Sequence, residues 1–161
     1  MATTSVLYGT STAITCTLAS LADSATVGRQ STVVDNTSNL YDDALLFISV
    51  TTAGTVATPF AVYVYIFGSE DGTNYIADDG VIGATDAAYT VNAASNLKGP
   101  FIISTPTTAK IYSTIISIAS CFGGVMPRKW GFVVVNDSGA ALNSSEGAHI
   151  KTYTGVKTTI A

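Results

Sequence analysis

The chain has 161 residues, of which 47% are hydrophobic and 11% are charged, and its formal net charge is −4. One domain covering residues 1–161 fits this length, and the hydrophobic content argues against disorder. The acidic balance argues against nucleic acid as a partner, and a surface with so few charges, against about a quarter of residues in ordinary soluble domains, favours obligate assembly.

Strand-like segments follow one another along the chain. They are rich in β-branched and aromatic residues and are bounded by Gly, Pro, Asn and Asp, which is typical of short strands joined by turns. We expect strands over Thr12–Leu18, Arg29–Asp35, Ala44–Thr51, Pro59–Phe67, Ala88–Ala93, Leu97–Ser104, Ile111–Ala119, Lys129–Asn136 and Ala148–Gly155. This pattern predicts an all-β domain, an antiparallel β-sandwich of about 8–9 strands and of jelly-roll or immunoglobulin-like type.

The N-terminal residues 1–27 are expected to form an arm or a segment that covers the sandwich. Ile14, Cys16 and Leu18 share one face of an alternating segment, which predicts Cys16 as a small core residue. Whether Cys16 pairs with Cys121 is left open by the sequence.

A helix competes with the strand prediction at two places. Ile111, Ile115 and Ile118 also fit helical spacing, but their β-branched neighbours and the later Gly-Gly pair favour a strand. A short helix over Leu18–Ala25 is the second alternative.

Several predicted strands are apolar on both faces. Tyr63, Tyr65 and Phe67 line one side of a strand whose other side carries Val62, Val64 and Ile66. Leu45 and Phe47 likewise oppose Leu46, Ile48 and Val50. A two-layer sandwich buries only the inner face of each sheet, so something must cover the outer faces. The alternatives are a loop or the N-terminal segment of the same chain, or another subunit.

The sequence contains little that could carry catalysis. His149 is the only histidine, so one chain cannot form a multi-histidine metal centre, and no GxSxG elbow or phosphate loop is present. We expect His149 to be a surface or structural residue. The expectation is a protein that is not an enzyme, with no catalytic residues, no cofactor and no metal.

The acidic turn Gly68–Gly72 resembles a ligand loop at first sight. A calcium loop needs oxygen ligands at alternating positions, and SEDGTNYIADDG lacks that alternation. An ordinary turn is therefore the favoured interpretation, since Gly68 and Gly72 permit positive φ and the acidic side chains at the tip of the turn are expected to be solvated.

The basic-aromatic group Arg128, Lys129 and Trp130 has two interpretations. It could stack on a ligand or cover a neighbouring subunit, or it could begin a strand with Trp130 in the core. The core interpretation of Trp130 is favoured. Together with Tyr63, Tyr65 and Phe67, the three residues form the candidate interface.

Three stretches resemble a group of small structural proteins of tailed bacteriophages. They are GRQSTVVDNTSNLYDDALLFISV (Gly28–Val50), AVYVYIFGSEDGTNY (Ala61–Tyr75) and FGGVMPRKWGFVVVNDSGAAL (Phe122–Leu142). The resemblance implies a virion component made in the cytoplasm of the bacterial host. No charged segment precedes an apolar stretch near the N-terminus, and the longest uncharged run is a poor membrane span, so neither secretion nor a membrane partner is expected.

Within that group, a capsid decoration or cement protein is the favoured function. Its expected partners are the phage major capsid protein or other virion proteins and further copies of itself, because two-faced strands suit burial between neighbours. The alternative is a carbohydrate-binding β-sandwich of a tail or head fibre used in host attachment. Trp130, Tyr75 and Tyr89 would then supply the aromatic platforms.

Overall fold

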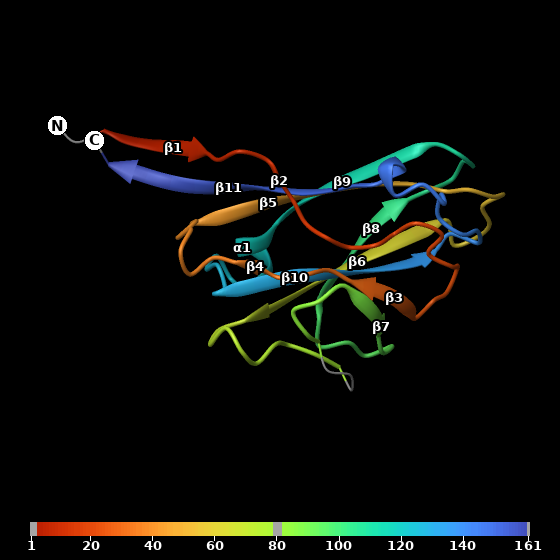
Figure 1. Ribbon diagram of the computed structural model, residues 1–161, viewed down its shortest axis with the longest axis horizontal. Coiled ribbons are helices and arrows are strands. Elements are labelled where there is room, and N and C mark those ends of the chain that lie inside the picture. Colours follow the sequence, from red (N-terminus) through yellow and green to blue (C-terminus); the bar gives the residue numbers. More distant parts are fainter. Residues whose placement is uncertain (1–2, 79–81, 161) are drawn as a thin grey trace.

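The computed structural model describes residues 3–78 and 82–160 and arranges them as two packed antiparallel sheets (Figure 1). Sheet A contains five strands: β1 Thr4–Tyr8, β2 Thr12–Ala13, β5 Asp43–Thr51, β9 Ile111–Ser117 and β11 Ile150–Ile160. Sheet B contains six: β3 Val27–Gln30, β4 Val34–Asp35, β6 Ala61–Ser69, β7 Ala87–Thr90, β8 Lys98–Ser104 and β10 Lys129–Asp137. The predicted all-β sandwich is confirmed.

The strand order defines the type of sandwich. Sheet A runs β1-β11-β5-β9, with β2 also on β11, and sheet B runs β7-β3-β10-β6-β8, with β4 also on β10. Successive long strands change sheet from β3 to β5 to β6 and again from β8 to β9 to β10 to β11. Two such interleaved four-stranded sheets form a jelly roll, to which β7 adds an edge strand beside β3.

The main core lies between the two sheets and follows from alternation along the strands. Leu46, Ile48 and Val50 of β5 point inward and are fully buried, as are Val62, Val64 and Ile66 of β6. Trp130 of β10 closes the same cluster and packs edge-to-face on Tyr153, with ring centroids 5.6 Å apart. This is the residue period of two that a half-buried strand requires.

A second core covers the outer face of sheet B. Phe67, Val133 and Val135 point away from the main core and pack against Ile82, Tyr89, Val91 and Leu97. These last four residues belong to the long connection from β6 to β8. The chain therefore covers this face with its own β6–β8 connection, which includes strand β7.

One strand was not predicted and three predicted strands differ strongly in extent, because segments distant in the sequence pair with one another. Strand β1 is absent from the prediction because its partner is the C-terminal end of β11. The predicted strand Arg29–Asp35 is divided into β3 and β4, because Ser31 and Thr32 bond to Phe132 and to Thr15 instead of continuing one ladder. Of Thr12–Leu18 only Thr12–Ala13 is strand, and Ala148–Gly155 is replaced by β11, which begins at Ile150.

Both helical alternatives are now resolved. Ile111–Ser117 is strand, and the helix α1 begins at Ile118 and ends at Cys121, with Ser117 as its N-cap. Residues 18–25 contain no helix, and the only other helical segment in the described residues is the 3₁₀ turn Glu146–Ala148.

The N-terminal segment closes one side of the sandwich. The Ile14 N–H donates to the Lys151 carbonyl of β11 in sheet A, while the Thr15 carbonyl accepts from the Thr32 N–H of the segment that joins β3 to β4 of sheet B. Ile14, Cys16 and Leu18 are buried between these contacts. Residues 3–8, in contrast, lie outside the sandwich in a ribbon.

Candidate interaction surface

The outer face of sheet A is the large face that the described residues leave uncovered. Leu45 and Phe47 of β5 lie on it half-buried, and their neighbours across the ladders include Ile115 of β9, paired with Phe47. Ile111 and Ile115 are 73% and 65% exposed, and Ile150 of β11 is 47% exposed. Figure 1 shows no element drawn over this face.

The same face carries almost no charge. Between the apolar side chains lie Ser and Thr residues of β5, β9 and β11. Among the described residues, the charged residue on this face is Asp43, the first residue of β5. The Asp43 carboxylate accepts from the Ser117 hydroxyl and from the Ala119 N–H, so it caps the start of α1. An apolar face without charges is the composition expected at the buried centre of an interface.

A two-stranded ribbon extends this face beyond the sandwich. Strand β1 pairs with Val156–Ile160 of β11, whereas β11 pairs with β5 no further than Val156 (Figure 1). Every residue of β1 is exposed. The registers Tyr8↔Val156 and Val6↔Thr158 place Tyr8 and Val6 on the same side as the outer face of sheet A. Apolar side chains thus occur on this side of the sheet from β9 to the ribbon, with Ser and Thr residues between them.

The predicted interface residues lie elsewhere and are divided between burial and exposure. Phe67 is fully buried in the second core, and Tyr63 and Tyr65 are half-buried against it. Trp130 is fully buried in the main core, which leaves it unavailable to a partner in this structure. Trp130 therefore lies in the core at the start of a strand, as the favoured interpretation of the sequence expected.

Arg128 and Lys129 are the members of that group that reach the surface. Arg128 is exposed, and the described residues offer it no ion-pair partner. Lys129 lies opposite Ser69 in the ladder, and its Nζ is 3.8 Å from a carboxylate oxygen of Asp35.

The acidic turn after β6 satisfies its own charge. The Asp71 carboxylate accepts from the N–H groups of Thr73 and Asn74, both at 2.7 Å, and from the Ser69 hydroxyl at 3.0 Å. These hydrogen bonds, that from the Asn74 N–H first, hold the pKa of Asp71 well below its ordinary value. Gly72 has a φ of +82°. The segment is built as a turn.

A cavity of about 640 Å³ lies between this turn and the segment after α1. Its walls include Tyr75, Phe122 and Met126, with Glu70, Asn74 and Arg128 supplying polar groups. Tyr75 packs edge-to-face on Phe67 at 5.8 Å, which fixes the ring beside the cavity. Of the three aromatic platforms considered for sugar binding, Tyr75 lines this cavity, while Trp130 and Tyr89 are buried.

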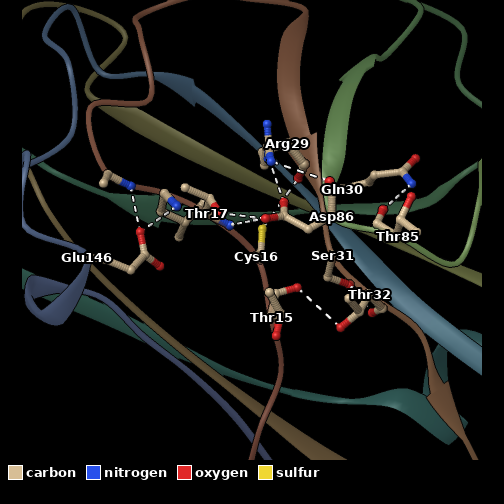
Figure 2. Close-up of polar contacts among 12 residues, drawn as sticks. Thr15, Cys16, Thr17, Arg29, Gln30, Ser31, Thr32, Thr85, Asp86 and Glu146 are labelled. Carbon is tan, nitrogen blue, oxygen red and sulfur yellow. Dashed lines mark hydrogen bonds and ion pairs between the residues drawn. The ribbon is translucent and has the colours of Figure 1, made fainter.

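A polar cluster pins the closing N-terminal segment to both sheets (Figure 2). Asp86 accepts from the Arg29 guanidinium and from both the N–H and the hydroxyl of Thr17. Burial by itself would raise the pKa of Asp86, but the hydrogen bonds from Arg29 and Thr17 outweigh it and hold that pKa below its ordinary value. These bonds thus hold the N-terminal segment at Thr17 against strand β3 at Arg29.

Glu146 supplies the second carboxylate of this cluster. It accepts from the N–H groups of Leu18 and Ala19 at 2.9 and 2.7 Å and forms an ion pair with Lys151. Burial opposes ionisation, yet the Lys151 hydrogen bond and the Ala19 N–H lower the pKa of Glu146.

The histidine and the two cysteines, which are the remaining candidate reactive groups, are buried or partly buried. His149 is buried; its Nδ1 accepts from the Thr51 N–H at 3.4 Å and its Nε2 lies 3.1 Å from the Asn143 carbonyl. Cys16 and Cys121 are free thiols, and burial raises the pKa of both.

Two further observations concern the described part of the chain. It holds no group of three or more His, Cys, Asp or Glu side chains that could bind a metal ion. None of the helices in residues 3–78 and 82–160 has the length and apolar character needed to cross a bilayer.

The geometry therefore defines a jelly-roll β-sandwich in which the described residues cover the outer face of sheet B and leave that of sheet A open. Comparison with known proteins finds no matching family model, no matching curated protein and no matching solved structure.

Proposed function

We propose that the protein is a non-enzymatic structural protein of a bacteriophage virion, made in the host cytoplasm, that decorates or cements the capsid. One observation carries this proposal: the outer face of sheet A is apolar, nearly free of charge and uncovered, while the chain covers the outer face of sheet B itself. The resemblance of Gly28–Leu142 to small phage structural proteins supplies the biological setting. Jelly rolls occur in viral capsid and lectin domains, so the fold by itself favours neither.

The physical mechanism is burial coupled to assembly. Complete burial of an Ile side chain contributes about 1.5–3 kcal/mol, and on this face Ile111 and Ile115 are 73% and 65% exposed. A protein that binds the assembled shell and not its separated subunits stabilises the shell by linkage. The acidic net charge of −4 disfavours a position against packaged DNA.

The test uses two surface variants with equal starting exposure. Ile150 lies on the outer face of sheet A and Val27 on sheet B, and both are 47% exposed. We expect Ile150→Glu to abolish incorporation into purified particles, measured by mass spectrometry, and Val27→Glu to leave it unchanged. Absence of the wild-type protein from mature virions, or equal incorporation of both variants, would contradict the proposal.

Carbohydrate binding is the second candidate function, and the cavity beside the acidic turn is the observation that favours it. Tyr75 offers an aromatic ring within reach of Glu70, Asn74 and Arg128, the kind of polar side chains that hydrogen-bond sugar hydroxyls. A glycan array with the isolated protein tests it. Specific binding that Tyr75→Ala and Arg128→Ala both remove would support host attachment, and an array without signal would exclude this function for the glycans displayed.

A further inference from the structure

Strand β9 is an edge strand with an unused hydrogen-bonding side. Ile111–Ser117 pairs with β5 along seven consecutive residues, without a register shift. On its other side, no backbone or side-chain hydrogen bond reaches the main chain of Ile111–Ile116 from any described residue. The unpaired N–H and C=O groups of such an edge are a template for another strand.

The sequence of β9 lacks the devices that protect edge strands. IYSTIIS contains no charged residue and no proline, and its outward isoleucines are Ile111 and Ile115. The edge of sheet B at β8 is different, because β8 carries Lys98 and Pro100 and its ladder with β6 has a register shift. Natural edges use these features to prevent pairing. This contrast distinguishes β9 from β8.

We propose that β9 pairs antiparallel with β9 of a second copy of this chain, about a two-fold axis at Ser113. The outward residues Ile111, Ser113 and Ile115 are symmetric about Ser113, while the inward residues on either side are Tyr112 and Thr114. In this register Ile111 of each copy lies opposite Ile115 of the other, and Ser113 lies opposite Ser113. All of these side chains are on the outer face of sheet A, so the pairing creates two isoleucine pairs across the interface.

The other unprotected edge of sheet A offers no such match. On the outer face, centring β1 on Val6 would place Thr4 opposite Tyr8, whereas the β9 register places Ile111 opposite Ile115. Self-complementarity therefore favours β9 over β1 as the isologous edge.

The pairing has a consequence for the uncovered face. A two-fold axis perpendicular to the sheet keeps the outer faces of both copies on the same side. The apolar surface of one copy, with Phe47 and Ile115, then continues directly into that of the other. This inference deepens the proposed function by assigning a surface to the further copies of the chain that the sequence analysis expects as partners, and it rests on that function.

The first test measures mass in solution. We expect the wild-type chain to sediment at twice its 16.5 kDa at micromolar concentration. Ile115→Lys places two charges in the interface and should weaken dimerisation by about tenfold or more. The control is Ile102→Lys on β8, which is 61% exposed and should leave the dimer unchanged. A wild-type monomer, or a dimer insensitive to Ile115→Lys, would overturn the inference.

The second test reads the register by cross-linking in a Cys121→Ser background. Opposed residues of an antiparallel pair have Cα atoms about 4.5–5.5 Å apart, within disulfide range. Ser113→Cys should give a covalent dimer under mild oxidation, and the exposed control Ser104→Cys on β8 should not. Ile111→Cys and Ile115→Cys should cross-link when mixed and neither should alone. Any other pattern rejects this register.

The two proposals fail separately. A monomer that still enters particles would refute the β9 pairing alone. A β9-paired dimer that never enters particles would refute the virion function alone.

Discussion

Replacing Asp86 with Asn should destabilise the fold by loosening the segment that closes the sandwich. The Asp86 carboxylate joins Thr17 of that segment to Arg29 of β3 (Figure 2). Asn retains the shape but loses the charge, and it turns an NH₂ group toward donors. Thr17 and Arg29 then compete for the single remaining acceptor.

The expected loss in the free energy of unfolding follows from the hydrogen bonds that Asp86 accepts and from the solvent exposure of the side chains that form them. Hydrogen bonds to charged groups contribute about 1.5–3 kcal/mol each, and the side chains of Asp86 and Arg29 are 13% and 31% exposed. Partial screening by solvent lowers the total, so we expect a loss of about 2 kcal/mol. For a domain of this size that corresponds to a fall in Tm of about 4–8 °C.

The assay is thermal and urea unfolding of both proteins from pH 7 to pH 3. The folded-state pKa of Asp86 lies below its unfolded value of about 3.9, so its stabilisation is present above that pH and is lost as pH falls through the folded-state pKa. The difference between wild type and Asp86→Asn should therefore be full at pH 7 and shrink below about pH 4. Equal stability at pH 7, or a difference independent of pH, would refute this reasoning.

Asp137→Asn is the matched control for the loss of a carboxylate. Burial first, and then the charge of Asp23, raises the pKa of Asp137 above its ordinary value. The ionised form is thus disfavoured in the folded state, and removing it at pH 7 should leave the free energy of unfolding unchanged or slightly higher. A loss as large as that of Asp86→Asn would show that any carboxylate removal has this effect.

Two further predictions concern packing and thiol reactivity. A Cβ at Gly155 would overlap the Tyr41 ring, so Gly155→Ala should cost about 1–3 kcal/mol in urea unfolding, and an unchanged midpoint would contradict this close approach. Cys16 is fully buried with a raised pKa whereas Cys121 is partly exposed, so a thiol reagent at pH 8 should label Cys121 alone until the protein unfolds. Rapid labelling of both thiols in the native state would contradict the burial of Cys16.

Local sequence patterns were sufficient for most elements of this fold. The runs of β-branched and aromatic residues in β5 and β6, bounded by turn residues, predicted both strands within a few residues. The turn after β6 was predictable around Gly72 and Asp71, which satisfy it locally, but Gly68 is still part of β6 and does not have a positive φ. Strand β1 was not predictable, because its hydrogen-bond partners lie about 150 residues away in β11.

The sequence predicted that an apolar surface would need to be covered, but it did not predict which residues form that surface. Apolar residues on both faces of β5 and β6 indicated that both sheets need covering, and they pointed to Tyr63, Tyr65 and Phe67 as an interface. In the folded chain the connection carrying Ile82 and Tyr89 covers the face of Phe67 instead. No local pattern specifies where a long loop folds back, because that depends on contacts between distant residues.

The sequence by itself determined that this protein is an all-β sandwich with more apolar strand surface than two sheets can bury between them. Only the tertiary structure decided which part of that apolar surface stays exposed to solvent. The loop between β6 and β8 packs on sheet B, whereas Leu45, Phe47 and Ile115 of sheet A have no covering segment among the described residues. The physical reason is that alternation places side chains on a face, while burial of that face depends on which distant segment packs against it.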